Sequence, residues 1–80
     1  FEFANTENLL KMFDMYENEA KSLVKEKLSL PAYDQCLKAS HVFNILDARG
    51  AIGVAQRAGY IGRIRDITKS AAAIWIDTQV

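Results

Sequence analysis

The fold depends on residues 40–50, which read Ser-His-Val-Phe-Asn-Ile-Leu-Asp-Ala-Arg-Gly. On a helix, four apolar side chains of this stretch point in widely different directions: Val42, Phe43, Ile45 and Leu46. A helix that is apolar on nearly all sides is typical of the centre of a helical bundle. Gly50 is a natural left-handed cap, so we expect this central helix to end near Ala48.

An amphipathic helix is predicted upstream, from Thr6 to about Leu28. Its apolar residues recur on one face at helical spacing: Leu9, Phe13, Tyr16, Ala20, Leu23 and Val24. Asn5 or Thr6 can cap its first turn. Because proline suits the first helical position, the central helix is expected to begin at Pro31, after a short connection that favours antiparallel neighbours.

A third helix is predicted from Gly53–Val54 to about Ile76. Its expected buried arc consists of Val54, Ile61, Ile64, Ala71, Ala72 and Trp75, with Tyr60 and Ile67 at one margin. The predicted fold class is therefore all-α, a three-helix antiparallel bundle.

Polar residues in the central helix form a stripe on an otherwise apolar surface. Ser40, His41, Asn44 and Asp47 are spaced i, i+1, i+4 and i+7, and a buried stripe of this kind needs hydrogen-bond partners. Arg57 falls in the middle of the apolar arc of the third helix, so we expect it to form a buried ion pair across the short connection, with Asp47 or a neighbouring acid.

Two further arginines in the third helix are expected to be unnecessary for the core. On the helical wheel Arg63 lies outside the buried arc and Arg65 lies at its edge. Residues 49–69 carry five basic side chains and one acidic side chain, whereas the net charge of the chain is zero. The two arginines could contact RNA phosphates, but a solvated role or a protein interface is at least as well supported.

Composition excludes several classes of function. The single cysteine, Cys36, cannot form an internal disulfide and is expected to be buried, which together with the absence of a signal peptide favours the cytoplasm. One histidine and one cysteine give no metal-ligand spacing, and no apolar run is long enough to cross a membrane. His41 fits a structural histidine better than a catalytic base. The chain begins with Phe1 rather than methionine, which indicates a fragment.

Several segments across the chain form a recognisable series: Phe1–Asn5, Tyr16–Ala20, Leu30–Tyr33, Lys38–Arg49, Arg57, Tyr60–Ile61 and Arg63–Arg65. In their residues and their order they resemble the alpha subunit of bacterial glycyl-tRNA synthetase of the heterotetrameric type. Where the family commonly has a Ser…Glu capping box, this chain has Gly53 and Gln56, which retain only part of it.

The resemblance implies that residues 1–5 are the tail of an upstream class II catalytic domain and residues 6–80 a C-terminal helical domain of a larger α+β subunit. The parent enzyme would use ATP and Mg²⁺ to activate glycine and transfer it to tRNA(Gly). Its partners would be a beta subunit, a second alpha subunit and, in the assembled enzyme, tRNA(Gly). No catalytic, cofactor or metal residue is carried over, and the isolated fragment is expected to be inactive.

The expected contact residues are polar or charged and lie in the second and third helices: His41, Asn44, Asp47, Arg49, Arg57, Arg63 and Arg65. They are candidates for structural contacts or for contacts to the catalytic domain, the beta subunit or tRNA. The alternative function is a non-enzymatic helical protein-interaction module from an unrelated protein.

Overall fold

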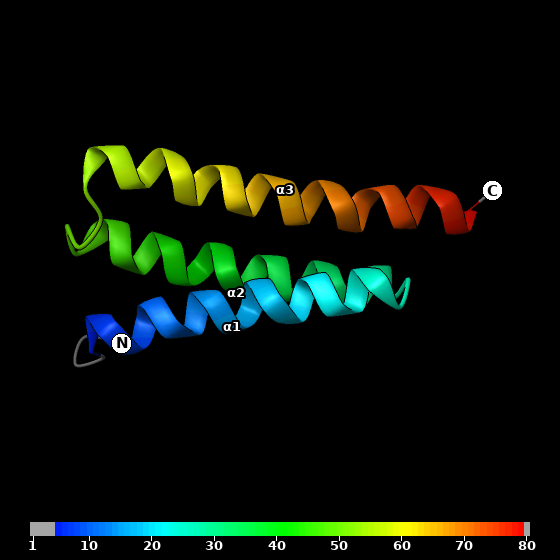
Figure 1. Cartoon of the computed structure of the whole chain (residues 1–80), viewed down its shortest axis with the longest axis horizontal. Coiled ribbons are helices and arrows are strands. Elements are labelled where there is room, and N and C mark those ends of the chain that lie inside the picture. Colours follow the sequence, from blue (N-terminus) through cyan, green and yellow to red (C-terminus); the bar gives the residue numbers. More distant parts are fainter. Residues whose placement is uncertain (1–4, 80) are drawn as a thin grey trace.

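The structure, a computed structural model, describes residues 5–79, with side chains described up to Asp77. Within this range the chain forms three α-helices and no strand: α1 (Thr6–Lys25), α2 (Ser29–Ala48) and α3 (Val54–Gln79). Successive helices run in opposite directions, and α2 lies between its two neighbours (Figure 1). The prediction of an all-α, three-helix antiparallel bundle is confirmed. Of residues 1–5, which were expected to precede the helical domain, 1–4 lie outside the described range and Asn5 is the N-cap of α1.

Side-chain and backbone caps fix both ends of α1. The Asn5 side chain accepts a hydrogen bond from the Glu7 amide at 2.7 Å, as the sequence predicts for an N-cap. At the other end Lys27 adopts a left-handed conformation with φ 60°, and the Leu28 amide donates to the Leu23 carbonyl. This Schellman arrangement ends α1 at Lys25, whereas periodicity alone predicted Leu28.

The α2 helix begins two residues before the predicted position. It starts at Ser29, and no side chain caps it. Pro31 is accommodated because the amides of the first helical turn have no intrahelical acceptor in any case. The first bond of the ladder runs from the Ala32 amide to the Leu28 carbonyl, directly after the proline.

Glycine residues shape the connection between α2 and α3. Gly50 has φ 69°, as expected of a left-handed cap, and the Ala51 amide donates to the Leu46 carbonyl. The Gly53 amide then donates to Oε1 of Gln56 at 3.1 Å. This second bond is the surviving half of a capping box, and it sets the start of α3 at Val54.

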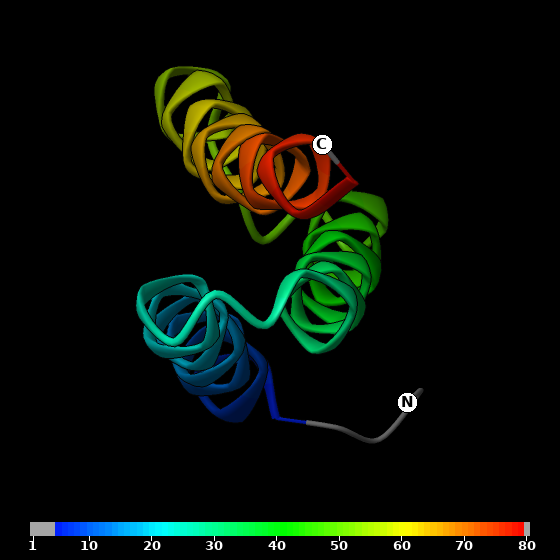
Figure 2. The same ribbon diagram turned by 90° about the vertical axis from the view of Figure 1, so that its right-hand side faces the viewer.

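The hydrophobic core lies where α2 faces α1 on one side and the middle of α3 on the other (Figure 2). Its buried apolar residues are Leu9, Phe13, Ala20, Ala32, Cys36, Ala39, Val42, Phe43, Leu46, Ile52, Ile67 and Ala71. The predicted buried face of the first helix, the central character of the second and the burial of Cys36 are confirmed.

The predicted buried arc of α3 is wrong near both of its ends. Val54 is 92% exposed, Trp75 is 45% exposed and Ala72 is also exposed, whereas Ile67, placed at the margin, is buried. α3 has 26 residues and is about 39 Å long, against about 30 Å for its 20-residue neighbours. The C-terminal end of α3 therefore extends past the other two helices (Figure 1), which accounts for the exposure of Trp75.

None of the described helices is long and apolar enough to cross a membrane.

Candidate interaction sites

The polar stripe of α2 faces solvent for much of its length. His41 and Asn44 are exposed, while Ser40 and Asp47 are partly buried. The expectation of a buried stripe is therefore wrong. The reason is that α1 and α3 contact two other sides of α2 and leave this side of the helix uncovered.

Asp47 and Arg57 form the predicted ion pair across the connection between α2 and α3. The Nε atom of Arg57 donates to Oδ2 of Asp47 at 3.2 Å. The Arg57 side chain is 54% exposed, so the expectation that the pair is buried is wrong. Arg57 lies in the first turn of α3, before this helix reaches the core. The pair brings together two of the seven candidate residues.

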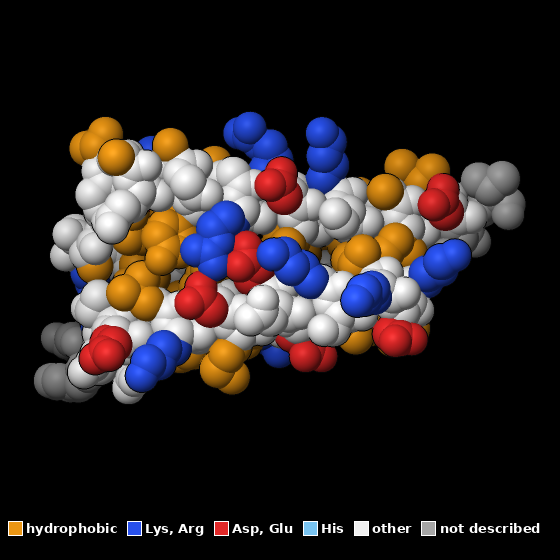
Figure 3. Space-filling view, viewed as in Figure 1, with side chains coloured by type: hydrophobic (Ala, Val, Ile, Leu, Met, Phe, Trp, Pro, Cys, Tyr) orange, Lys and Arg blue, Asp and Glu red, His pale blue; other side chains and the backbone are white. Residues whose placement is uncertain are grey.

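Arg63 joins α3 to α1 and is the centre of the largest charge cluster in the described structure. Its Nε atom donates to Oε2 of Glu17 at 2.9 Å, and its NH2 group donates to Oε1 of Glu17 at 2.6 Å. The same NH2 group donates to Oδ1 of Asp14 at 2.7 Å. Basic and acidic side chains meet between α3 and α1 in the space-filling view (Figure 3). The expectation that Arg63 is unnecessary for the core is wrong.

Two aromatic rings pack against the guanidinium group of Arg63. The Arg63 Cζ atom lies 4.7 Å from the ring centroid of Phe13 and 5.0 Å from that of Tyr60. The two rings pack edge to face, with centroids 4.8 Å apart. Cation–π attraction strengthens when the cation is partly removed from water. We call Arg63, Glu17, Asp14, Phe13 and Tyr60 the Arg63 cluster.

Electrostatics in the Arg63 cluster favour the charged forms of both main partners. The hydrogen bonds from Arg63 lower the pKa of Glu17 below 4.5, against the opposing effect of burial. The same bonds to Glu17 raise the pKa of Arg63. Glu17 is the one buried charged residue of the described chain and is only 7% exposed, so its charge depends on this partner.

The remaining candidates lie elsewhere on the surface. Arg49 is the C-cap residue of α2 and is partly buried. Arg65 is exposed on α3. Together with His41 and Asn44, these residues are distributed along the outer sides of two helices. The seven candidates therefore do not converge on one site.

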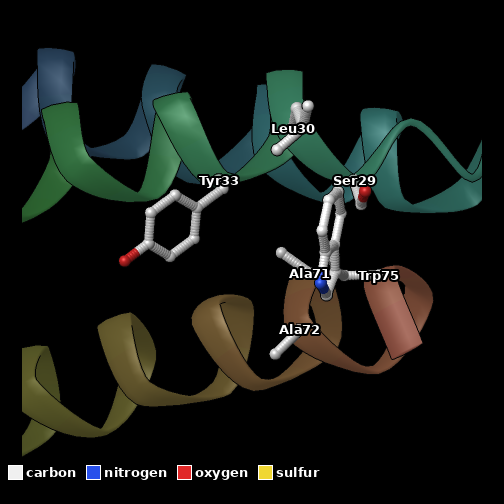
Figure 4. A pocket seen from close by; sticks show the side chains of 6 residues that line it. All are labelled: Ser29, Leu30, Tyr33, Ala71, Ala72 and Trp75. Carbon is white, nitrogen blue, oxygen red and sulfur yellow. The ribbon is translucent and has the colours of Figure 1, made fainter. Parts of the chain in front are cut away.

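Sequence reasoning missed an apolar groove between the start of α2 and the end of α3. The groove has a volume of about 250 Å³ and is lined by Ser29, Leu30, Tyr33, Ala71, Ala72 and Trp75. The Tyr33 ring projects from α2 toward α3, and the Trp75 indole rises from α3 beside Ser29 (Figure 4). The signal was present in the i, i+3, i+7 spacing of Leu30, Tyr33 and Leu37, apolar residues on a side of α2 that the core does not use.

The chemistry of these sites is set by their apolar lining, by one buried thiol and by the placement of the acidic side chains. The groove is lined almost wholly by apolar side chains and is smaller than the roughly 300–1,000 Å³ typical of small-molecule sites. Burial raises the pKa of the Cys36 thiol, which makes it a poor nucleophile. Residues 5–77 contain no group of three His, Cys, Asp or Glu side chains that could hold a metal ion.

The described residues thus form a small helical bundle with an arginine cluster between α1 and α3 and an apolar groove between α2 and α3. The family comparison is more specific, because the family model for the glycyl-tRNA synthetase alpha subunit matches residues 1–80. The chain belongs to the glycyl-tRNA synthetase alpha subunit family. The resemblance noted in the sequence is thereby confirmed at the level of the family.

Family membership implies a role in a glycine–tRNA ligase, an enzyme that uses ATP and Mg²⁺. In general terms it also implies a beta subunit and tRNA as partners. A Mg²⁺ site needs several oxygen ligands close together. The described residues contain no such group of acidic side chains, and the carboxylates of Glu17 and Asp14 bind Arg63.

Proposed function

We propose that this chain is the C-terminal helical region of the alpha subunit and that it supplies scaffold and subunit contacts rather than chemistry. The observation that carries the proposal is the family match over residues 1–80, in a chain whose described residues form three packed helices. In this proposal the parent enzyme activates glycine with ATP in a catalytic domain upstream, in the cytoplasm, and then transfers the glycyl group to tRNA(Gly).

The surface chemistry supports a contact role. The exposed sides of α2 and α3 carry the candidate residues His41, Asn44, Arg49 and Arg65, and an apolar groove lies between the two helices. Contacts to the catalytic domain, the second alpha subunit, the beta subunit or tRNA would use these surfaces. The zero net charge of the chain gives little long-range attraction for RNA, which favours protein partners.

Two measurements test the proposal. The isolated chain should give no glycine-dependent ATP–pyrophosphate exchange above background. A full alpha subunit that lacks this region should bind the beta subunit at least about tenfold more weakly, and this loss corresponds to about 1.4 kcal/mol. Exchange activity in the isolated chain, or full beta-subunit affinity after the deletion, would reject the proposal.

A further inference from the structure

One side of the pair formed by α2 and α3 is largely apolar and uncovered. Leu30, Tyr33 and Leu37 are exposed on α2, and Trp75 and Ile76 are exposed on α3. The groove with Tyr33 and Trp75 in its walls (Figure 4) lies between these two sets of side chains. We call this side, defined by these five residues, the α2–α3 face. Monomeric proteins seldom leave a contiguous apolar surface of this kind uncovered.

The α2–α3 face carries opposite charges on its two helices. Leu30, Asp34 and Leu37 are spaced i, i+4 and i+7, so Asp34 lies in one row of α2 between two exposed leucines. On α3, Lys69 lies one turn before Ala72, which lines the groove. Asp34 and Lys69 are both exposed, and neither forms an ion pair with any described residue. The face is therefore acidic along α2 and basic along α3.

The two charges lie at nearly the same height of the bundle. Tyr33 and Ala72 line the same groove, and α2 and α3 run in opposite directions (Figure 1). A step forward along α2 therefore matches a step back along α3, so Asp34 lies about level with Lys69. By the same count Leu30 lies about level with the C-terminal turns of α3.

A two-fold axis parallel to the helices makes this face complementary to itself. Rotation about such an axis lays α2 of one copy over α3 of the other and keeps every residue at its own height. Asp34 of each copy then meets Lys69 of the other, so each contact occurs twice. A partner of a single charge sign would instead meet a like charge on one of the two helices. Four helices, two from each copy, would enclose the apolar side chains, as in a four-helix bundle.

We infer that the α2–α3 face binds the same face of a second copy of this chain, across a two-fold axis parallel to the helices. Tyr33 and Trp75 are buried at the centre of the interface, where aromatic side chains contribute most to binding. Asp34 and Lys69 form ion pairs between the copies, and the exposed Arg65, one turn before Lys69, adds to the positive side. The inference rests on the proposed contact role and goes further, because it selects one surface and one partner.

The decisive experiment exchanges the two charges in the chain of residues 1–80 and measures dimerisation by sedimentation equilibrium. Asp34→Lys and Lys69→Asp should each weaken the dimer at least about tenfold, because each places like charges together twice. The double variant restores opposite charges and should return the dissociation constant to within about threefold of the native value. Circular dichroism shows whether each variant keeps its helices.

A matched control makes the same exchange outside the α2–α3 face. Asp66 borders a hollow between α1 and α3, and Lys25 is the last residue of α1; both are exposed. Asp66→Lys combined with Lys25→Asp should leave the dissociation constant within about twofold, as is usual for surface changes away from a contact.

Cross-linking in the full alpha subunit tests the same contact if the shorter chain does not fold alone. Asp34→Cys and Lys69→Cys subunits, mixed in equal amounts and oxidised, should form a disulfide-linked dimer. Each variant oxidised alone should form much less, because the axis separates like positions. Cys36 is buried and does not compete.

Three outcomes would overturn the inference: a folded native chain that stays monomeric, single variants that dimerise like the native chain, or mixed subunits that cross-link no more than each alone. Loss of beta-subunit or tRNA(Gly) affinity in Asp34→Lys, with self-association unchanged, would assign the face to that partner instead. The proposed function fails separately, when deletion of the whole region leaves beta-subunit binding intact.

Discussion

Arg63 is the residue with the largest expected effect on stability. It is the main polar link between α1 and α3, and its removal would leave the buried carboxylate of Glu17 without its partner. Arg63→Ala should therefore lower the free energy of unfolding by about 2–3 kcal/mol, below the range for a fully buried pair because Arg63 itself is partly exposed. Urea denaturation followed by circular dichroism measures the change.

The exposed pair of Asp47 and Arg57 is the natural comparison. Arg57→Ala should cost at most about 1 kcal/mol, as is usual for surface ion pairs. In the cluster, Glu17→Ala combined with Arg63→Ala should cost clearly less than the sum of the single changes, because both partners of one contact are removed together. Additive single effects, or equal costs for Arg57→Ala and Arg63→Ala, would contradict this assignment.

Glu17 should also govern part of the response of the bundle to acid. Its pKa is below 4.5 in the folded state, so its carboxylate stabilises the fold fully above that pH. The contribution is lost as the pH falls through the lowered folded-state value. Unfolding free energies measured over a pH series should show a gap between the native chain and Glu17→Gln that is widest near neutral pH and narrows below 4.5. A gap that does not depend on pH would rule out the carboxylate as its cause.

At the scale of the elements, two helix ends use the same motif with different residues. α1 ends with Lys27 and α2 ends with Gly50, both in the left-handed conformation. This conformation costs a residue with a side chain roughly 1–2 kcal/mol, but glycine adopts it freely. Lys27→Gly should therefore raise the melting temperature and Gly50→Ala should lower it. Shifts of the same sign would show that factors other than backbone conformation dominate at these positions.

Two other glycines lie within α3 and have no such requirement. A Cβ atom at Gly59 or Gly62 would meet no atom within 4 Å. Glycine inside a helix costs about 0.5–1 kcal/mol relative to alanine. Gly59→Ala and Gly62→Ala should each stabilise the chain by about this amount in thermal unfolding, with Gly50→Ala as the opposite control. Destabilisation by either change would contradict the open surroundings that the structure gives these two positions.

The sequence predicted the elements better than their contacts. The cap at Asn5, the left-handed Gly50 and the apolar face of α1 follow from local patterns, and all were predicted correctly. The contact of Arg63 was not predicted, because its partner Glu17 lies 46 residues away in the sequence. A helical wheel describes one helix and contains no information on the neighbouring helix. Likewise Trp75 reads as a core residue, and its exposure follows from the length of α3 relative to its neighbours. The Asp47–Arg57 pair was predictable because it spans one short connection.

At the scale of the whole molecule, the core is a single layer of side chains on either side of α2. A chain of 80 residues buries only a little more than roughly 60% of its unfolded surface, so its stability alone should be modest. The apolar side chains that line the groove remain open to solvent, so they contribute less to the core. Any partner that covered this groove would therefore add to the stability of the bundle.

The position of Cys36 makes the opening of this bundle measurable as a chemical rate. Its thiol is 2% exposed on α2, and its raised pKa keeps it protonated, so a maleimide reagent can modify it only during excursions that expose it. When closing is faster than modification, the observed rate divided by the rate for the unfolded chain equals the fraction of time spent open. Modification in native buffer should be far slower than in denaturant and should accelerate in Arg63→Ala. Equal rates in the two solvents would mean that α2 is not held between its neighbours.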